Sequence, residues 1–286
     1  MNRIGYLKKH ARELISAETE YKIDETGMNN VIIMTRDMIF RFPKYESVLS
    51  SMQQEVEILK LLNTQVALNI PSPSVYHLDP DNLESSFIGY KMIQGIPLSK
   101  DVFNDIADKE VLARTLALYL KTIHAVEYQA FESIGVKTID PIQEFTLMYE
   151  KIKNRLFEFM RDDAKEDIRN GFEGFLSTYS EEAIEFKLIH GDFGPSNLLV
   201  KGEMLSGVID FGGMSISDPA YDFACMMGPF GYGEEFVRMV GTYYGNIDAY
   251  IERAKFYITT FALQDALFGI ENNSKEDFDF GMKPYI

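Results

Sequence analysis

Three polar side chains on two neighbouring strand–turn segments have the types and spacing that catalysis requires. Asp192 follows an apolar run within Leu188–Val200, and Asn197 comes five positions later. A second apolar run, Val208-Ile209, leads to Asp210, thirteen positions beyond Asn197. A single aspartate at such a place is typical of a hydrogen-bonded turn. Two apolar runs that each end in an aspartate, with an asparagine between them, favour a catalytic group instead.

Phosphoryl transfer is the chemistry that suits this set of side chains. The reaction needs positioned metal ions, charge neutralisation and an oriented nucleophile, but little covalent help from the protein. Asp210 and the amide oxygen of Asn197 are ligands that Mg²⁺ accepts. Asp192 is then left to take the proton of an attacking hydroxyl as a general base.

The first third of the chain predicts a small antiparallel sheet with one inserted helix. An amphipathic helix is expected over 4–17, and a helix over 47–63 that Ser50 or Ser51 would cap. Short β-rich runs separated by turn-forming residues predict strands. They occupy residues 21–23, 31–34, 38–42, 74–78 and 86–92.

The rest of the chain is mostly helical. Gln94–Leu98 breaks the strand pattern and reads as a linker. Apolar residues at helical spacing predict helices over 112–123, 141–161, 164–179 and the region 233–270. Short strands are expected at 187–189, 197–201 and 207–211. The predicted class is α+β, with a β-rich N-terminal lobe and a larger, mainly helical C-terminal lobe.

The motif His190–Asn197, followed by Ile209–Gly212, resembles the aminoglycoside phosphotransferase and choline kinase superfamily, relatives of the protein kinases. Ser217–Ala224 also resembles that family. The runs at 39–44, 54–60 and 95–98 resemble its 2″-aminoglycoside phosphotransferase group. This resemblance covers nearly the whole chain. It implies a two-lobed protein-kinase-like fold and a small-molecule kinase that uses Mg²⁺ with ATP or GTP.

The resemblance also implies the domains, with a nucleotide-binding lobe at 1–93, a hinge at 94–98, and a helical lobe at 99–286 that carries the catalytic loop and acceptor site. Arg41 would bind the α- and β-phosphates, with Glu55 as its ion-pair partner. Protein kinases have lysine at this position, and arginine is not equivalent to it. Lys44 is the alternative phosphate ligand. A second alternative makes Arg41 a solvent-facing residue between two phenylalanines.

Other nucleotide contacts follow from the same resemblance. Gly27 and Asn30 lie in the turn that stands in place of a glycine-rich phosphate loop. Backbone groups of Lys91 and Ile93 would bind the purine edge at the hinge. Tyr90 would stand at the gatekeeper position, where a bulky tyrosine accompanies GTP use in the 2″ group. The alternative for Tyr90 is a tyrosine that simply packs in the sheet.

The acceptor is the least determined part of the sequence. The net charge of −16 argues against nucleic acid as a partner and suits capture of a cationic small molecule. The carboxylates expected to lie near an aminoglycoside acceptor are Asp218, Asp222, Glu234 and Glu235, and Asp265 or Glu271 could line the same pocket. Residues 228–233 are apolar where the 2″ group is acidic, which favours the alternative of a macrolide or a hydroxylated metabolite. A non-catalytic nucleotide-binding module is disfavoured because all three catalytic positions are intact.

Composition and hydropathy bear on disulfide bonds, membrane segments and the cellular compartment. Cys225 is the single cysteine, so no intramolecular disulfide can form, as suits a reducing cytoplasm. No apolar stretch approaches the roughly 20 residues of a membrane span, and the N-terminal segment lacks the apolar core of a signal peptide. We therefore expect a cytoplasmic monomer with no membrane partner. His124 is predicted to be a packed or capping residue, and His190 to orient the catalytic loop.

Overall fold

The computed structural model describes residues 2–16, 18–27, 29–181 and 184–286. The chain divides into two compact units, and each consists of several sequence segments. A sheet unit contains residues 1–108, 129–136 and 196–214, and a helical unit contains 109–128, 137–195 and 215–286. The sequence predicts consecutive lobes, whereas the units interleave. The assignment of nucleotide binding and acceptor binding to residues 1–93 and 99–286 stays a prediction.

A five-stranded antiparallel sheet forms most of the sheet unit. Its strand order is β1-β2-β3-β5-β4. The strands are β1 (Lys22–Asp24), β2 (Asn30–Met34), β3 (Met38–Pro43), β4 (Pro73–His77) and β5 (Phe87–Lys91). Consecutive strands β1, β2 and β3 pair in order, which confirms the predicted meander. A short 3₁₀ turn, Leu83–Ser85, precedes β5.

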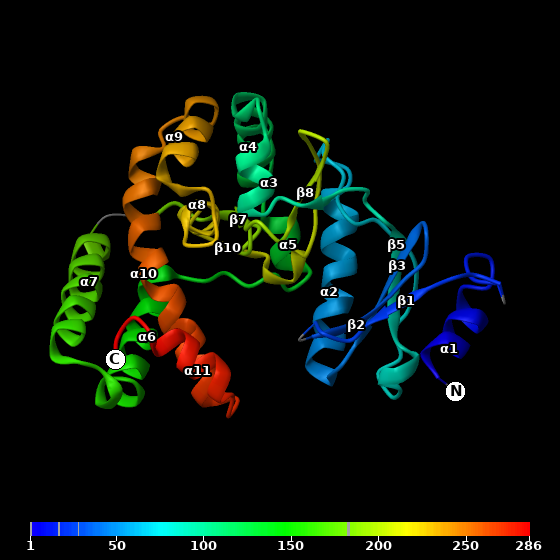
Figure 1. The fold of residues 1–286 in the computed structure, drawn as a ribbon, viewed down its shortest axis with the longest axis horizontal. Coiled ribbons are helices and arrows are strands. Elements are labelled where there is room, and N and C mark those ends of the chain that lie inside the picture. Colours follow the sequence, from blue (N-terminus) through cyan, green and yellow to red (C-terminus); the bar gives the residue numbers. More distant parts are fainter. Residues whose placement is uncertain (1, 17, 28, 182–183) are drawn as a thin grey trace. The chain divides into compact units, whose positions relative to one another are not determined.

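One helix covers each face of this sheet (Figure 1). Phe40 and Phe42 of β3 pack in the same core as Leu7 of α1 (Arg3–His10). On the opposite face, Met52 and Val56 of α2 (Glu46–Leu62) pack with residues of β5. The alternation of side chains along a strand therefore separates two small cores.

Two local predictions in this region are wrong. Helix α1 ends at His10 because Ala11 leaves the helical conformation, so the predicted helix over 4–17 is shorter; residue 17 lies outside the described residues. Helix α2 begins at Glu46, and its N-cap residue, Tyr45, makes no side-chain capping hydrogen bond. Ser50 and Ser51 instead lie inside α2, where their hydroxyls donate to carbonyl oxygens one turn earlier.

The predicted linker at 94–98 contains a strand. β6 (Ile96–Pro97) pairs with β8 (Leu198–Lys201), which pairs with β9 (Met204–Val208). Gly95 precedes β6 with φ of 157°, and a Cβ atom there would lie 2.5 Å from Ser206 Oγ. Only glycine lets the chain pass so close to the β8–β9 hairpin. Helices α3 (Lys100–Asp105) and α5 (Gln129–Ser133) complete the sheet unit.

The helical unit consists of long helices around an aromatic core and one small sheet. Its helices are α4 (Lys109–His124), α6 (Pro141–Arg155), α7 (Asp162–Glu181), α8 (Ala220–Met227), α9 (Gly233–Tyr244), α10 (Asp248–Glu271) and α11 (Lys275–Met282). The strands β7 (Lys187–Ile189) and β10 (Ser215–Ser217) pair antiparallel. Phe145 of α6 stacks on Tyr257 of α10 and meets Phe175 of α7 edge-on. These ring contacts hold the three helices together.

One helix of this unit ends earlier than predicted. The region 141–161 is α6 followed by a 3₁₀ turn, Phe157–Phe159. The region 233–270 contains helices as predicted, namely α9 and α10, which are separate because Gly245 and Asn246 both take positive φ between them. The α+β class is confirmed. None of the helices in the described part of the chain has the length and apolar character of a membrane span.

Candidate active site

The β8–β9 hairpin places Asn197 and Asp210 at one end. Leu198 pairs with Val208, and the backbone N–H of Ile209 donates to the Asn197 carbonyl oxygen at 2.9 Å. Asn197 thus pairs with Ile209 just beyond the two strands, and Asp210 is the next residue of the chain after Ile209. Sequence spacing alone predicted both residues, and the hairpin register brings them to the same edge of the sheet unit.

The donor set at this hairpin end fits Mg²⁺. Asp210 has φ of 63°, a left-handed conformation that aspartate tolerates better than most residues. Its carboxylate faces the N–H of Gly212 in the 3₁₀ turn Phe211–Gly213 and stays exposed. One exposed carboxylate and one amide leave coordination positions for phosphate oxygens and water, the usual mode of Mg²⁺ binding.

Arg41 and Glu55 form a buried ion pair on the α2 face of the sheet. Arg41 Nη1 lies 2.6 Å from Glu55 Oε1, and the two side chains are only 12% and 4% exposed. The predicted pairing is therefore present, and the solvent-facing alternative for Arg41 is wrong. Burial disfavours the charged guanidinium, but the charges of Glu55 and Asp210 and the hydrogen bond to Glu55 outweigh burial and raise the pKa of Arg41.

Tyr90 completes this group. It lies in β5 opposite Ile39, packs against Met52 and Val56 of α2, and hydrogen-bonds Arg41. Burial raises the pKa of Tyr90 to about 12, so the phenol keeps its proton at neutral pH. The structure thus gathers a cation, two carboxylates and a phenol, on Arg41, Glu55, Asp210 and Tyr90, within the sheet unit.

Lys44 lies apart from this group, on the β1–β2 turn. Its Nζ donates to the Glu25 carbonyl oxygen at 2.6 Å and also to the carbonyl oxygen of Gly27. Its backbone N–H donates to Asn29. Lys44 therefore stabilises the β1–β2 turn, which contains Gly27 and ends at Asn30, the first residue of β2, whereas the Arg41 side chain faces α2. Met28 of this turn lies outside the described residues.

The predicted hinge residues directly follow the central sheet. Lys91 ends β5 with an exposed side chain, and Ile93 is half-buried two residues later. The backbone N–H of Met92, between them, donates to the Asp37 carbonyl oxygen at 2.8 Å. Their contact with a purine stays a prediction.

Asp222 holds the catalytic loop of the helical unit in place. The loop begins after β7, and Gly191 turns it with φ of 77°. Both Asp222 oxygens accept backbone N–H groups of this loop, from His190 at 2.9 Å and from Gly191 at 2.9 Å. His190 Nδ1 in turn accepts the N–H of Asp192 at 3.3 Å, which confirms its predicted orienting role.

The prediction that Asp222 contacts the acceptor is wrong. Its side chain is 0% exposed, and its oxygens are taken up by the loop and by His124. His124 Nε2 lies 3.1 Å from Asp222 Oδ2, and its Nδ1 lies 2.9 Å from the hydroxyl of Tyr244. A carboxylate only accepts, so Nε2 carries the proton of that bond. His124 is thus the packed residue that the sequence predicts, and it also orients Asp222.

Asp218 was also predicted to lie near the acceptor, but it is buried and ties two helices of the same unit together. It binds Arg253 of α10 in a bidentate pair, at 2.5 and 2.9 Å, and accepts the hydroxyl of Tyr257 at 2.6 Å. It also accepts the N–H of Ala220, at the start of α8. These bonds make Asp218 a structural residue of the helical unit.

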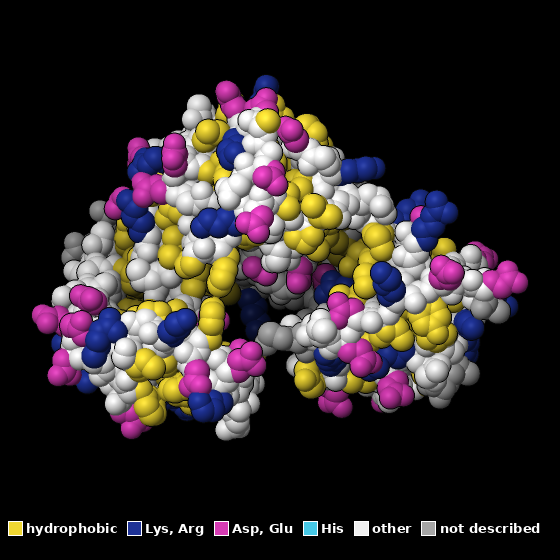
Figure 2. All heavy atoms as spheres, in the orientation of Figure 1, with side chains coloured by type: hydrophobic (Ala, Val, Ile, Leu, Met, Phe, Trp, Pro, Cys, Tyr) yellow, Lys and Arg dark blue, Asp and Glu magenta, His cyan; other side chains and the backbone are white. Residues whose placement is uncertain are grey.

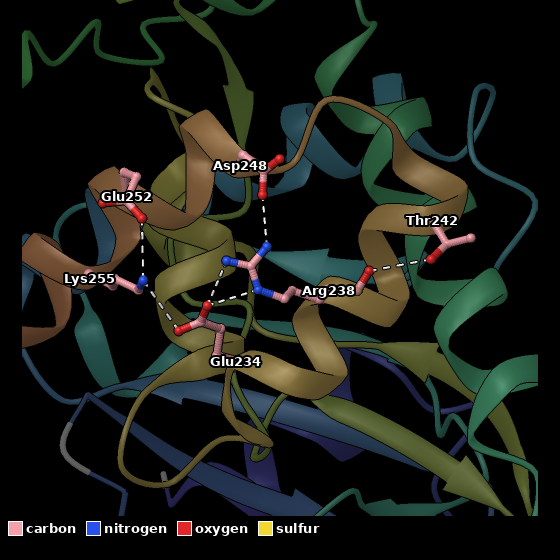
Figure 3. Close-up of polar contacts among 6 residues, drawn as sticks. All are labelled: Glu234, Arg238, Thr242, Asp248, Glu252 and Lys255. Carbon is pink, nitrogen blue, oxygen red and sulfur yellow. Dashed lines mark hydrogen bonds and ion pairs between the residues drawn. The ribbon is translucent and has the colours of Figure 1, made fainter.

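The predicted acceptor carboxylates on α9 differ in their surroundings. Glu234 lies 2.7 Å from Arg238 and 3.4 Å from Lys255, and Arg238 also pairs with Asp248 (Figure 3). The hydrogen bond from Arg238, opposed by burial and helped by Lys255, lowers the pKa of Glu234. Glu235 is exposed. On the face shown in Figure 2, acidic and basic side chains are likewise interspersed.

Comparison with known proteins agrees with this constellation. Residues 24–257 match the model of the phosphotransferase enzyme family APH. Viomycin phosphotransferase of Streptomyces vinaceus is 28% identical over 209 residues, which cover 71% of this chain and 70% of that protein.

Solved structures show the same fold over nearly the whole chain. The GDP and kanamycin complex of a 2″-aminoglycoside phosphotransferase has a TM-score of 0.88 at 25% identity, covering 98% of this chain and 95% of that one. A type I macrolide 2′-phosphotransferase has a TM-score of 0.79 at 18% identity, covering 99% and 95%. The fold is therefore that of the protein-kinase-like small-molecule phosphotransferases. This chain belongs to the phosphotransferase enzyme family APH and is a small-molecule kinase.

Proposed function

We propose that this kinase transfers the γ-phosphate of GTP or ATP to a hydroxyl group of an aminoglycoside antibiotic and thereby confers resistance. The observation that carries the phosphoryl-transfer part is the grouping of Arg41 with Glu55, Tyr90 and Asp210. A triphosphate needs a charged guanidinium close to a metal ligand. The guanidinium and the Mg²⁺ ion that the ligand would hold both neutralise negative charge that builds up in the transition state.

Each catalytic residue has one role in the proposed reaction. Asn197 and Asp210 would hold Mg²⁺, which neutralises phosphate charge when it is bound. Arg41 binds the α- and β-phosphates. Asp192 takes the proton as the acceptor oxygen bonds to the γ-phosphorus. The bond from that phosphorus to the bridging oxygen breaks, and the nucleoside diphosphate leaves with the bonding electrons.

Tyr90 supports GTP as a donor used at least as well as ATP. Its ring is buried between β5 and α2, so it reduces the space behind the purine position next to Lys91 and Ile93. The related 2″-aminoglycoside phosphotransferase structure contains GDP. We expect a cytoplasmic monomer on the grounds of composition given above.

The acceptor assignment rests on charge and on relatives. The net charge of −16 would concentrate a polycation near the protein. The structural relative contains kanamycin, and the curated relative is named for viomycin, both cationic antibiotics. Glu235 would contact the amino groups of the aminoglycoside. Glu234 would contribute less, because Arg238 and Lys255 already balance its charge. A macrolide is the second candidate, because Phe230 in the apolar α8–α9 loop is largely exposed.

Nucleoside diphosphate release from GTP and ATP would test the proposal, with kanamycin, viomycin and erythromycin as acceptors. We expect release that depends on both an acceptor and Mg²⁺, and that is lost in Asp192→Ala. Mass spectrometry should find one added phosphate on the acceptor. If none of the three antibiotics gains phosphate while a sugar or amino alcohol does, the antibiotic assignment is wrong and the metabolite alternative replaces it.

A further inference from the structure

Two aromatic side chains of the helical unit are exposed and stack on each other. Phe230 is 71% exposed and Phe280 is 54% exposed. Their ring centroids lie 6.5 Å apart, with planes 15° from parallel. Phe230 belongs to the loop that joins α8 to α9, and Phe280 belongs to α11. Single exposed apolar residues are ordinary, but an adjoining aromatic pair leaves apolar area that a ligand can cover.

This aromatic pair lies close to the catalytic loop. A Cβ atom on Gly194, two residues after Asp192, would be 3.9 Å from the carbonyl oxygen of Cys225. A Cβ atom on Gly231, which follows Phe230, would be 3.2 Å from the same oxygen. The loop with the proposed base and the loop with the exposed phenylalanine therefore meet at one carbonyl group.

Two carboxylates accompany the aromatic pair. Asp277 precedes Phe280 by three residues on α11, so both side chains lie on neighbouring positions of one helix face. Asp265 lies on α10, where a Cβ atom on Gly281 would be 2.9 Å from the Cα of Ala266. This close crossing brings the two carboxylates together, and the pKa of Asp265 is raised by burial and by the charge of Asp277.

Helix α10, which carries Asp265, also lies near the proposed base. The ring of Tyr221 contacts the rings of Tyr257 and Phe261 of α10 at centroid distances of 5.9 Å, and burial, with a smaller contribution from the charge of Asp192, raises the pKa of the Tyr221 phenol. In the described part of the chain, neither Asp265 nor Asp277 forms an ion pair. Their mutual repulsion would be relieved by a cationic ligand.

We propose that Phe230 and Phe280, with Asp265 and Asp277, form an acceptor subsite for a molecule that carries an alkylammonium group on a bulky apolar scaffold. The aromatic pair takes the apolar face of the scaffold, and the two carboxylates take the ammonium group. This inference rests on the proposed kinase function, and between its two candidate acceptors it favours the macrolide over the aminoglycoside. Among cationic acceptors, the subsite favours those with a large apolar face over polyhydroxylated polyamines, which offer little area to the rings.

Steady-state kinetics with two acceptors would test the subsite. Erythromycin carries an alkylammonium sugar on an apolar ring, whereas kanamycin is a polycation without an apolar face. In Phe230→Ala/Phe280→Ala, we expect the KM for erythromycin to rise about tenfold or more. The KM for kanamycin should change less than about twofold, and so should kcat and the KM for nucleotide. Asp265→Asn should raise the KM for erythromycin about threefold.

Phe159→Ala is the matched control, because Phe159 is also exposed and its ring meets that of Phe278 on the same helix α11. An unchanged KM for erythromycin in the double variant would overturn the inference, as would an equal rise for both acceptors or the same rise in the control.

Calorimetric titration with erythromycin separates this test from the test of function. If kanamycin is phosphorylated but erythromycin does not bind, the kinase function stands and the subsite is wrong. If neither is phosphorylated, the kinase proposal fails for these acceptors. Erythromycin binding that the double variant loses would then still support the subsite, and its absence would overturn it.

Discussion

Replacing Asp222 with asparagine would test whether one buried carboxylate holds the catalytic loop. Its two oxygens accept N–H groups from His190, Gly191 and His124, at 2.9, 2.9 and 3.1 Å. Asparagine keeps the shape but has one acceptor oxygen, so its NH₂ group must face at least one of these donors. Hydrogen bonds to a charged group contribute about 1.5–3 kcal/mol each, and a buried donor without a partner costs about 1–3 kcal/mol.

The expected loss for Asp222→Asn is therefore about 2–5 kcal/mol of unfolding free energy. For a chain of this size, that corresponds to a decrease in Tm of about 5–15 °C. Because the variant shifts the loop that carries Asp192, we also expect kcat to fall about a hundredfold. The KM for nucleotide should stay nearly constant, since the Arg41 group lies in the other unit.

Thermal unfolding by circular dichroism and a coupled kinase assay would measure both effects. Asp167→Asn is the control, because it makes the same chemical change at an exposed carboxylate of the same unit and should alter neither value. A variant at Asp222 with Tm within about 1 °C of the unmodified protein, and kcat within about twofold, would refute the reasoning.

Four further predictions concern the catalytic and nucleotide groups. Asp192→Ala should lower kcat about 10²–10⁴-fold with little change in nucleotide affinity, and near-full turnover would remove it as the base. Asp210→Asn should weaken binding of the Mg²⁺–nucleotide complex, so a Mg²⁺ titration that does not shift would contradict its role as a ligand. Glu55→Gln should raise the KM for nucleotide, because Arg41 loses its buried partner; an unchanged KM would argue that Lys44 binds the phosphates. Tyr90→Ala should improve use of ATP relative to GTP in a competition assay, and a strong ATP preference of the unmodified protein would exclude the proposed crowding.

Local patterns in the sequence predicted most of the elements and the metal-ligand pair. Strand alternation and helical spacing report which face of an element is apolar, and this depends only on neighbours along the chain. Asn197 and Asp210 were predicted as metal ligands from their residue types and spacing, and the register of the β8–β9 hairpin places both at the same end of it. Boundaries were less predictable. The strand at 96–97 exists only because a distant hairpin offers it hydrogen-bond partners.

The sequence by itself therefore determined the family, the α+β class and the positions of the catalytic types, since these depend on residue order and local periodicity. Tertiary structure alone decided which polar groups are paired. Asp222 and Glu234 look alike as acidic residues near the start of helices, yet Asp222 is buried against the catalytic loop and Glu234 sits between Arg238 and Lys255. The partners of a carboxylate come from segments far away in the chain, and burial removes the water that would otherwise compete for it. Only the packing of those segments distinguishes a carboxylate that fixes the catalytic loop from one that could contact a substrate.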